Sequence, residues 1–142
     1  MRFWDTSALL PLVVVEAESQ RTRRWAREDP QVVVWTLTRV ELLSALARRR
    51  REQPKLERQL RSARRQILET WSRWGEVTAV EVVRRHAERL VETHRLRAAD
   101  AVQLGAALVA AADDPASLTF VTLDARQAAA AEREGFPVLG PE

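Results

Sequence analysis

The sequence begins with "MRFWDTSALL" (residues 1–10), in which a short apolar segment runs into an aspartate and two hydroxyl side chains. Residues 2–4 predict a short buried strand, and the apolar pattern that resumes after Ser7 predicts a helix over residues 6–19. Asp5 is therefore expected at the carboxyl end of a strand, directly ahead of a helix. In open parallel sheets, functional sites form beyond the carboxyl ends of the strands. This stretch predicts an α/β fold with an acid at the functional edge of its sheet.

Strands and helices are predicted to alternate along the rest of the chain. The segment "QVVVWT" (31–36) is short, continuous and β-branched, as buried parallel strands are. Further extended segments are expected at 76–78, 118–123 and 136–140, and helices at 19–29, 37–52, 54–74, 79–94, 97–112 and 125–134. Strands separated by single helices imply parallel pairing and a sheet covered on both faces. We expect a three-layer α/β/α sandwich with a short, mostly parallel central sheet, formed by residues 1–142 as one domain.

The composition limits the possible chemistry and location. The 142 residues include no cysteine, which excludes disulfides and thiolate zinc sites and fits a reducing cytoplasm. No stretch approaches the roughly 20 apolar residues of a membrane helix, so we expect a soluble protein. Lys55 is the only lysine, and arginines cluster, as in "RRRR" (48–51). Such clusters suit contacts with phosphate, although a solvated helix face explains any one of them equally well.

Four acids stand out by their positions: Asp5, Glu41, Asp100 and Asp124. Asp124 follows a predicted strand, as Asp5 does, so the two are expected at the same sheet edge. Each acid also has a structural explanation. Asp124 with Gln127 fits an N-terminal capping box, and Thr38 with Glu41 has the same spacing. Asp100 lies near a helix start, where the helix dipole favours a carboxylate. Any one of the acids alone is explained by helix capping.

The combination of acids indicates a metal site. Asp100 lies in "AADAVQLGAAL", where an unpaired carboxylate would be costly. Carboxylates that lie close together raise each other's pKa unless a cation is present. The cation that suits oxygen ligands is a hard divalent metal, Mg²⁺ or Mn²⁺. His86 and His94 lie on a charge-rich helix and are expected at the surface, so zinc is not expected.

Four segments carry a resemblance to a known family: "DTSALLPLVVVEAES", "TRVELLSAL", "LRAADAVQLGAAL" and "FVTLDARQAAAAEREGFPVL". In this order they resemble the motifs of PIN-domain ribonucleases, especially the VapC-type toxins of bacterial and archaeal toxin–antitoxin pairs. The resemblance spans essentially the whole chain and implies an α/β/α sandwich and metal-dependent RNA hydrolysis. It implies four catalytic metal ligands for Mg²⁺ or Mn²⁺, namely Asp5, Glu41, Asp100 and Asp124, with Thr6 and Ser7 as supporting hydroxyls. The expected products carry 5′-phosphate and 3′-hydroxyl ends.

The resemblance also suggests binding partners. The RNA backbone would be held by arginines, for which the candidates are Arg39, Arg48, Arg49 and Arg97. VapC-like toxins commonly form homodimers and bind a VapB-like antitoxin, so the resemblance implies that this chain forms a homodimer and is inhibited by such an antitoxin. An apolar stripe on the predicted helix 54–74 comprises Leu56, Leu60, Ala63, Ile67, Trp71 and Trp74. With Val40, Leu43 and Ala47 it would form a projecting helical pair that offers surface to another chain. Internal packing explains the stripe equally well.

Two other classes of function are compatible with parts of the sequence. The first is a non-catalytic interaction or RNA-binding module in which all the acids are helix caps. The second is a phosphoryl-transfer protein with Asp5 as nucleophile. Ser7 stands where haloacid-dehalogenase-like enzymes have a second aspartate, and Lys55 lies too early for the lysine of a receiver domain. The sequence leaves open which RNA is cut, whether one or two metals bind, and whether Asp124 is a ligand or only a cap.

Overall fold

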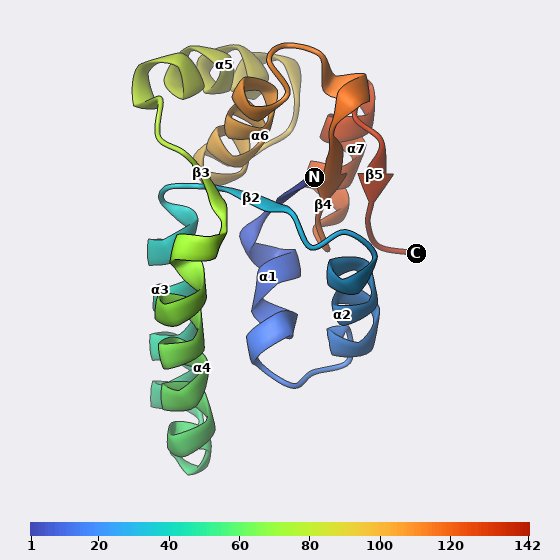
Figure 1. Ribbon diagram of the computed structural model, residues 1–142. Coiled ribbons are helices and arrows are strands. Elements are labelled where there is room, and N and C mark those ends of the chain that lie inside the picture. The colour runs from blue at the N-terminus through green and yellow to red at the C-terminus, as the bar shows by residue number, and fades with distance from the viewer.

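The computed structural model describes all residues, 1–142 (Figure 1). The expectation of single helices between the strands is wrong: two α-helices lie between successive strands among the first four, and one lies between the last two. The strands are β1 (Arg2–Trp4), β2 (Val32–Trp35), β3 (Gly75–Val77), β4 (Thr119–Val121) and β5 (Val138–Leu139). The helices are α1 (Thr6–Val13), α2 (Ser19–Glu28), α3 (Thr38–Glu52), α4 (Glu57–Thr70), α5 (Val80–Thr93), α6 (Ala98–Ala110) and α7 (Ala125–Arg133).

The five strands form one sheet in the order β3-β2-β1-β4-β5, and every pairing is parallel. The sheet was expected to be mostly parallel and is entirely so. Phe3 in the central strand β1 lies opposite Val33 of β2 and Phe120 of β4. Because the strands are parallel, their carboxyl ends meet at one edge of the sheet. Asp5 and Thr122 both leave the sheet at this edge.

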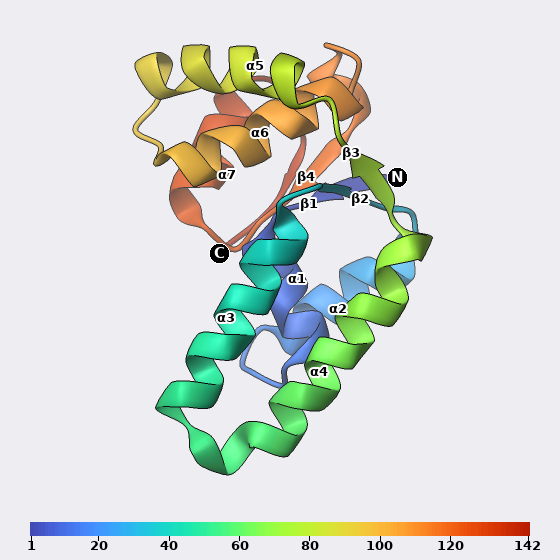
Figure 2. The same cartoon turned by 90° about the vertical axis from the view of Figure 1, so that its left-hand side faces the viewer.

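Each face of the sheet is covered by helices and has its own core. Successive strand residues point to opposite faces, so Phe3 packs in one core and Trp4 in the other. The first core lies under α5, α6 and α7 and includes Leu104. The second lies under α1 to α4 and includes Ile67. Figure 2 shows the two helical layers on either side of the sheet, which confirms the predicted three-layer α/β/α fold.

Helices α3 and α4 form a hairpin that projects away from the sheet (Figure 2). A short 3₁₀ turn, Pro54–Leu56, joins them. Most of the predicted apolar stripe is buried where α4 packs against α3 and α1. The buried residues of the stripe are Leu60, Ala63, Ile67 and Trp71. Leu56 near the tip remains 37% exposed, and Val40 on α3 is 62% exposed. The stripe therefore packs internally over most of its length and leaves a few apolar side chains uncovered.

Two predicted helix ends differ from the structure. The first predicted helix ends at Val13 instead of residue 19, because Val14 adopts an extended backbone, as β-branched residues favour. The helix predicted to end at Gly75 stops at Thr70, and Gly75 begins β3 instead. No helix of the chain has both the length and the apolar character that a membrane crossing requires.

Candidate active site

Asp5 is the most buried acid at the carboxyl edge of the sheet, with an exposed fraction of 1%. It is the N-cap of α1, and its Oδ1 accepts hydrogen bonds from the Ala8 backbone N–H (3.2 Å) and from Ser7 Oγ (2.6 Å). Its Oδ2 accepts from Thr122 Oγ1 at 2.9 Å and from Gln127 Nε2 at 2.6 Å. Capping therefore uses only one of the four donors that surround this carboxylate.

The environment of Asp5 disfavours its charged form. Burial raises the pKa of Asp5 to about 6, and the hydrogen bonds from Ser7 and Thr122 offset only part of that rise. No arginine, lysine or histidine forms an ion pair with it. At neutral pH the carboxylate is thus held by neutral donors alone, in a position where a cation would stabilise it.

The Gln127 amide joins Asp5 to a second acid, Asp100. Its Nε2 donates to Asp5 Oδ2 and also lies 3.2 Å from Asp100 Oδ1. Asp100 is in the first turn of α6, as predicted, and Gln127 is in the first turn of α7. Burial raises the pKa of Asp100, and the charge of Asp124 raises it further, while Arg97 acts in the opposite direction. The first turn of α6 and the N-cap of α7 thus place Asp100 and Asp124 at the edge of the sheet where Asp5 lies.

Asp124 is a helix cap, and the predicted capping box is only half correct. Its Oδ1 accepts hydrogen bonds from the backbone N–H groups of Arg126 (2.8 Å) and Gln127 (2.9 Å). The Gln127 side chain does not return to the Asp124 backbone, whose N–H donates to Thr122 Oγ1 instead. Because Thr122 accepts the hydrogen bond of the Asp124 backbone N–H, the Gln127 side chain is free to donate to Asp5 and Asp100.

Glu41 lies in a second polar cluster next to the first. Thr6 Oγ1 donates to Glu41 Oε2 at 2.8 Å, and Gln103 Nε2 lies 3.3 Å from Glu41 Oε1. Burial raises the pKa of Glu41, and the charge of Asp100 adds to the rise. Asp100 therefore interacts with Glu41 through its charge and is joined to Asp5 by the Gln127 amide.

The predicted capping role of Thr38 is wrong. The N-cap of α3 is Leu37, with no side-chain cap, and Thr38 is a fully buried residue inside the helix. Its hydroxyl accepts a hydrogen bond from Gln103 Nε2 at 2.9 Å. The spacing of Thr38 and Glu41 matches a capping box, but both side chains accept hydrogen bonds from Gln103 of α6 instead.

Sequence reasoning missed three residues that hold the acids in place: Gln103, Thr122 and Gln127. The two glutamines are almost fully buried, and the Oε1 atom of each has no hydrogen-bond partner. A polar residue inside an apolar helix segment, as in "AVQLGAAL", was the available signal. The sequence pattern could not show that the side-chain nitrogen atoms of Gln103 and Gln127 would point toward the acids.

The four arginines expected to hold RNA lie in two places, three on α3 and one before α6. Arg97 directly precedes α6 and interacts with Asp100. Arg49 pairs with Glu16 at 2.8 Å, and Arg39 lies over the Trp71 ring. Arg48 is exposed on α3. Only Arg97 is thus placed beside the acids.

The expectation that both histidines lie at the surface is wrong for His94. Its side chain is only 5% exposed, and its Nε2 lies 2.7 Å from Glu134 Oε1. The misjudgement arose because the charged residues around His94 belong to the outer face of α5, whereas His94 itself follows the last turn and folds inward.

The donor set at the edge fits a hard divalent cation. All the candidate ligands are carboxylate oxygens, and burial raises the pKa of Asp5, Glu41 and Asp100 together. As they stand, no three acidic or histidine side chains are gathered closely enough to hold a metal ion. The Gln127 amide occupies the position between Asp5 and Asp100, where it supplies the positive end of a dipole.

The fold and the acids together define an α/β/α protein with an oxygen-rich acidic site at the carboxyl edge of a parallel sheet. The model of one protein family, the PIN domain, matches residues 2–139, so the chain belongs to the PIN domain family. PIN domains are in general nucleases that need divalent metal ions. No curated protein matches the chain.

Proposed function

We propose that the protein is an endoribonuclease that hydrolyses RNA phosphodiester bonds with Mg²⁺ or Mn²⁺. The observation that carries the proposal is the cluster of Asp5, Glu41 and Asp100, whose pKa values are raised together at the sheet edge of a PIN domain. Raised pKa values of several neighbouring acids are typical of functional sites that bind a cation when no cation is present.

Each residue has a distinct role in this proposal. Asp5 and Asp100 are the principal metal ligands, with Glu41 and Asp124 beside them. Thr6 and Ser7 hold carboxylates by donating to Glu41 and Asp5. A metal held by these carboxylates would supply a water of lowered pKa and neutralise charge that develops on the phosphate. The hydroxyl and amide donors keep the carboxylates oriented, which limits the reorganisation that binding requires.

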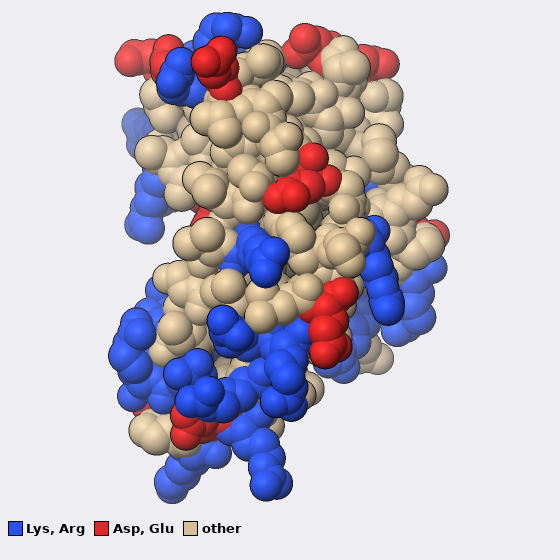
Figure 3. Space-filling view, turned by 60° about the vertical axis from the view of Figure 1, so that its left-hand side comes forward, with Lys and Arg blue, Asp and Glu red and all other residues tan.

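The charge distribution supports a nucleic-acid substrate. Basic side chains gather over the α3–α4 hairpin, in the lower half of Figure 3. Its exposed members are Arg48, Arg51, Lys55, Arg58, Arg61, Arg64 and Arg65. Of these, only Arg61 is in an ion pair, with Glu57 at 3.0 Å. Unpaired guanidinium groups in such number suit the phosphates of an RNA backbone.

The two alternative functions have less support. A module whose acids are only caps does not explain why three side-chain donors besides the cap surround Asp5. A phosphoryl-transfer protein of the receiver type needs a lysine beside its aspartate, whereas Lys55, the only lysine, lies in the turn at the tip of the α3–α4 hairpin. The acids of the cluster are better suited to bind a cation than to attack a phosphate.

The finer proposal is that the chain is a VapC-type toxin controlled by a VapB-like antitoxin. Its support is the resemblance of four sequence segments and the apolar surface next to the hairpin. Between α1 and α4 lies a hollow of about 330 Å³ lined by Val13, Val14, Val15, Leu56 and Leu60. An apolar segment of a second chain would find its partners there.

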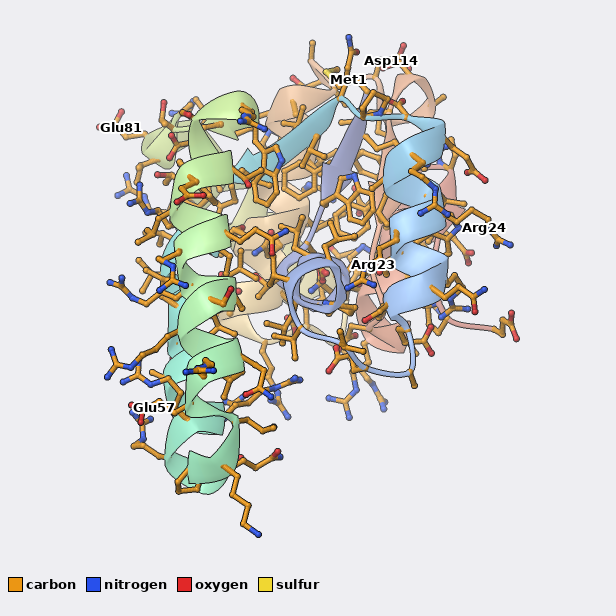
Figure 4. The ribbon with its side chains drawn as sticks, turned by 60° about the horizontal axis from the view of Figure 1, so that its bottom comes forward. Met1, Arg23, Arg24, Glu57, Glu81 and Asp114 are labelled. Carbon is orange, nitrogen blue, oxygen red and sulfur yellow. The ribbon has the colours of Figure 1, made fainter.

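The test is RNA cleavage by the purified full-length chain, with Mg²⁺ or Mn²⁺ and with a chelator. We expect cleavage only with the metal, and loss of cleavage in Asp100→Asn. The matched control is Asp114→Asn, an exposed aspartate beyond the other end of α6, near the Met1 end of the sheet (Figure 4). Cleavage that persists without metal, or equally in both variants, would overturn the proposal.

A further inference from the structure

A polar hollow of about 650 Å³ lies between the α5–α6 connection and α7. Its lining includes His94, Arg95, Arg126, Ala129, Ala130 and Arg133. Arg126 is two residues beyond Asp124, and Arg95 lies two residues before Arg97, which interacts with Asp100. The hollow therefore begins beside the candidate active site, and the Arg126 backbone N–H caps Asp124, but none of the lining side chains is hydrogen-bonded to the four acids.

The arginines of the hollow carry uncompensated charge. Arg95, Arg126 and Arg133 are exposed, and no carboxylate lies within ion-pair distance of any of them. Glu134, the acid next to Arg133 in the sequence, is already paired with Arg89. It accepts two hydrogen bonds from Arg89, at 3.0 and 2.7 Å. Three like charges are thus left facing one solvent-filled space, an arrangement that an anion would stabilise.

His94 adds a buried polar group to the wall of the hollow. The hydrogen bonds of Arg89 hold the pKa of Glu134 well below its usual range, so Glu134 is an ionised acceptor. His94 Nε2 therefore donates to Glu134, and the ring orientation is set by this bond. The opposite ring atom, Nδ1, is buried and has no partner.

The shape of the hollow follows the face of α7. Arg126 and Arg133 are seven residues apart, which places them on the same helix face at a spacing of about 10 Å. Between them lie Ala129 and Ala130, whose small side chains leave room above the helix. The result is a shallow channel that starts near Asp124 and runs for two turns along α7, with a positive charge at each end.

We propose that this channel binds phosphate groups of the RNA strand on one side of the bond that is cleaved. The inference rests on the proposed nuclease function and names a substrate-binding site for it. Guanidinium groups bind phosphate oxygens through paired N–H donors, and two arginines about 10 Å apart match the backbone of a short extended strand better than a single small anion.

The test is the binding of a fluorescently labelled single-stranded RNA to the full-length protein in the presence of a chelator, so that no cleavage is needed. Arg126→Gln/Arg133→Gln is compared with Arg84→Gln/Arg85→Gln, which removes the same charge from the exposed side of α5. We expect the channel variant to bind at least about tenfold more weakly at low salt. The slope of log K against log salt should fall by about 1.4, as the loss of two single-strand phosphate contacts predicts. The α5 variant should bind within about twofold of the unsubstituted protein.

The outcomes separate this inference from the nuclease proposal. Weaker RNA binding in the channel variant alone supports the channel, whether or not the protein cleaves RNA when metal is added. Equal binding by the two variants overturns the channel, even if metal-dependent cleavage is observed. A free pyrophosphate control identifies the source of the phosphate. If pyrophosphate raises the melting temperature of the protein but not of the channel variant, and RNA binding is unchanged by the substitutions, the site takes a small anion and the inference fails.

Discussion

Asp5 combines full burial with saturated hydrogen bonding, and this combination makes its protonation a factor in folding. The unfolded chain releases the proton near the ordinary aspartate pKa of 3.8, whereas the folded chain retains it up to about 6. The folded state therefore binds more protons between these values, and the free energy of unfolding must fall as pH rises through this range. The stabilisation is present below about pH 3.8 and is lost above about pH 6. Its size corresponds to about 3 kcal/mol.

The variant Asp5→Asn isolates this contribution. Asparagine keeps one acceptor oxygen, and the Gln127 amide can rotate to present its unpartnered Oε1 to the new NH₂ group. We expect metal-free Asp5→Asn to lack this fall in stability between about pH 4 and pH 6. Urea unfolding at several pH values measures the difference between the two proteins. Parallel pH profiles for both would show that Asp5 ionises in the folded protein as it does in the unfolded one.

Gln127 is expected to stabilise the metal-free protein and to compete with metal. Its Nε2 donates to both Asp5 and Asp100, so Gln127→Leu leaves the two carboxylates without this shared donor. The metal-free variant should lose about 1–3 kcal/mol of stability, as is usual when buried polar groups lose a partner. The rise in melting temperature on addition of Mn²⁺ should be larger than in the unsubstituted protein. A smaller rise would show that Gln127 assists metal binding.

The sequence predicted the positions of the acids better than their partners. Asp5 and Asp124 follow strands, and parallel topology alone places them at one edge. The roles of Thr38, Gln103 and Gln127 depend on side-chain directions that only the packing of α3, α6 and α7 determines. Local capping rules therefore explained Asp124 correctly and Thr38 incorrectly.

At the scale of elements, α5 and α6 pack so closely that their backbones nearly touch. A Cβ atom added at Gly105 would lie 2.9 Å from the Val83 carbonyl oxygen and 3.4 Å from the Ala87 backbone nitrogen. These neighbours are backbone atoms and cannot rotate away. Gly105 thus fixes the distance between the two helices, and with it the position of the Asp100 end of α6.

Gly105→Ala is predicted to destabilise the protein although alanine is the better helix former. Propensity alone would favour the substitution by about 1 kcal/mol. The steric conflict with α5 should outweigh this gain and leave a net loss of about 1–3 kcal/mol. Denaturant unfolding measures the change. The control is Ala99→Gly, at an exposed position in the first turn of α6, which should lose up to about 1 kcal/mol through propensity. A stabilised Gly105→Ala protein would contradict the close packing.

The elements themselves were largely predictable, since most of the short strands are mainly apolar and most of the helices have a periodic face; β3, with the sequence Gly-Glu-Val, is the least apolar strand. The exceptions lie where the chain changes direction without a strong local signal. The valines after α1 fit both helix and extended structure, and Gly75 fits both a helix end and a strand start. Pairing of β3 with β2 decides the second case, because Gly75 lies opposite Val33.

At the scale of the whole molecule, apolar side chains remain uncovered at the start of two helices. The neighbouring strands β2 and β3 end side by side, since the Thr36 backbone N–H donates to the Val77 carbonyl. The chain segments that leave them carry four exposed apolar residues, Leu37, Val40, Val80 and Val82. Their exposed fractions are 51%, 62%, 55% and 37%. Apolar surface gathered at one edge in this way is typical of protein–protein contacts.

We predict that this surface is the contact between two copies of the chain in the proposed homodimer. Val40→Asp/Val80→Asp would place two charges in the contact, where their desolvation opposes association. The expected result is a dimer for the unsubstituted protein and a monomer for the variant in light scattering at micromolar concentration. Because both side chains are more than half exposed in the single chain, the variant should keep its melting temperature within a few degrees when compared as a monomer. The control Arg84→Asp/Arg85→Asp changes charge on the outer face of α5 and should leave the dimer intact. A monomeric unsubstituted protein, or a variant that still dimerises, would show that these valines serve another purpose, and the nuclease proposal would be unaffected.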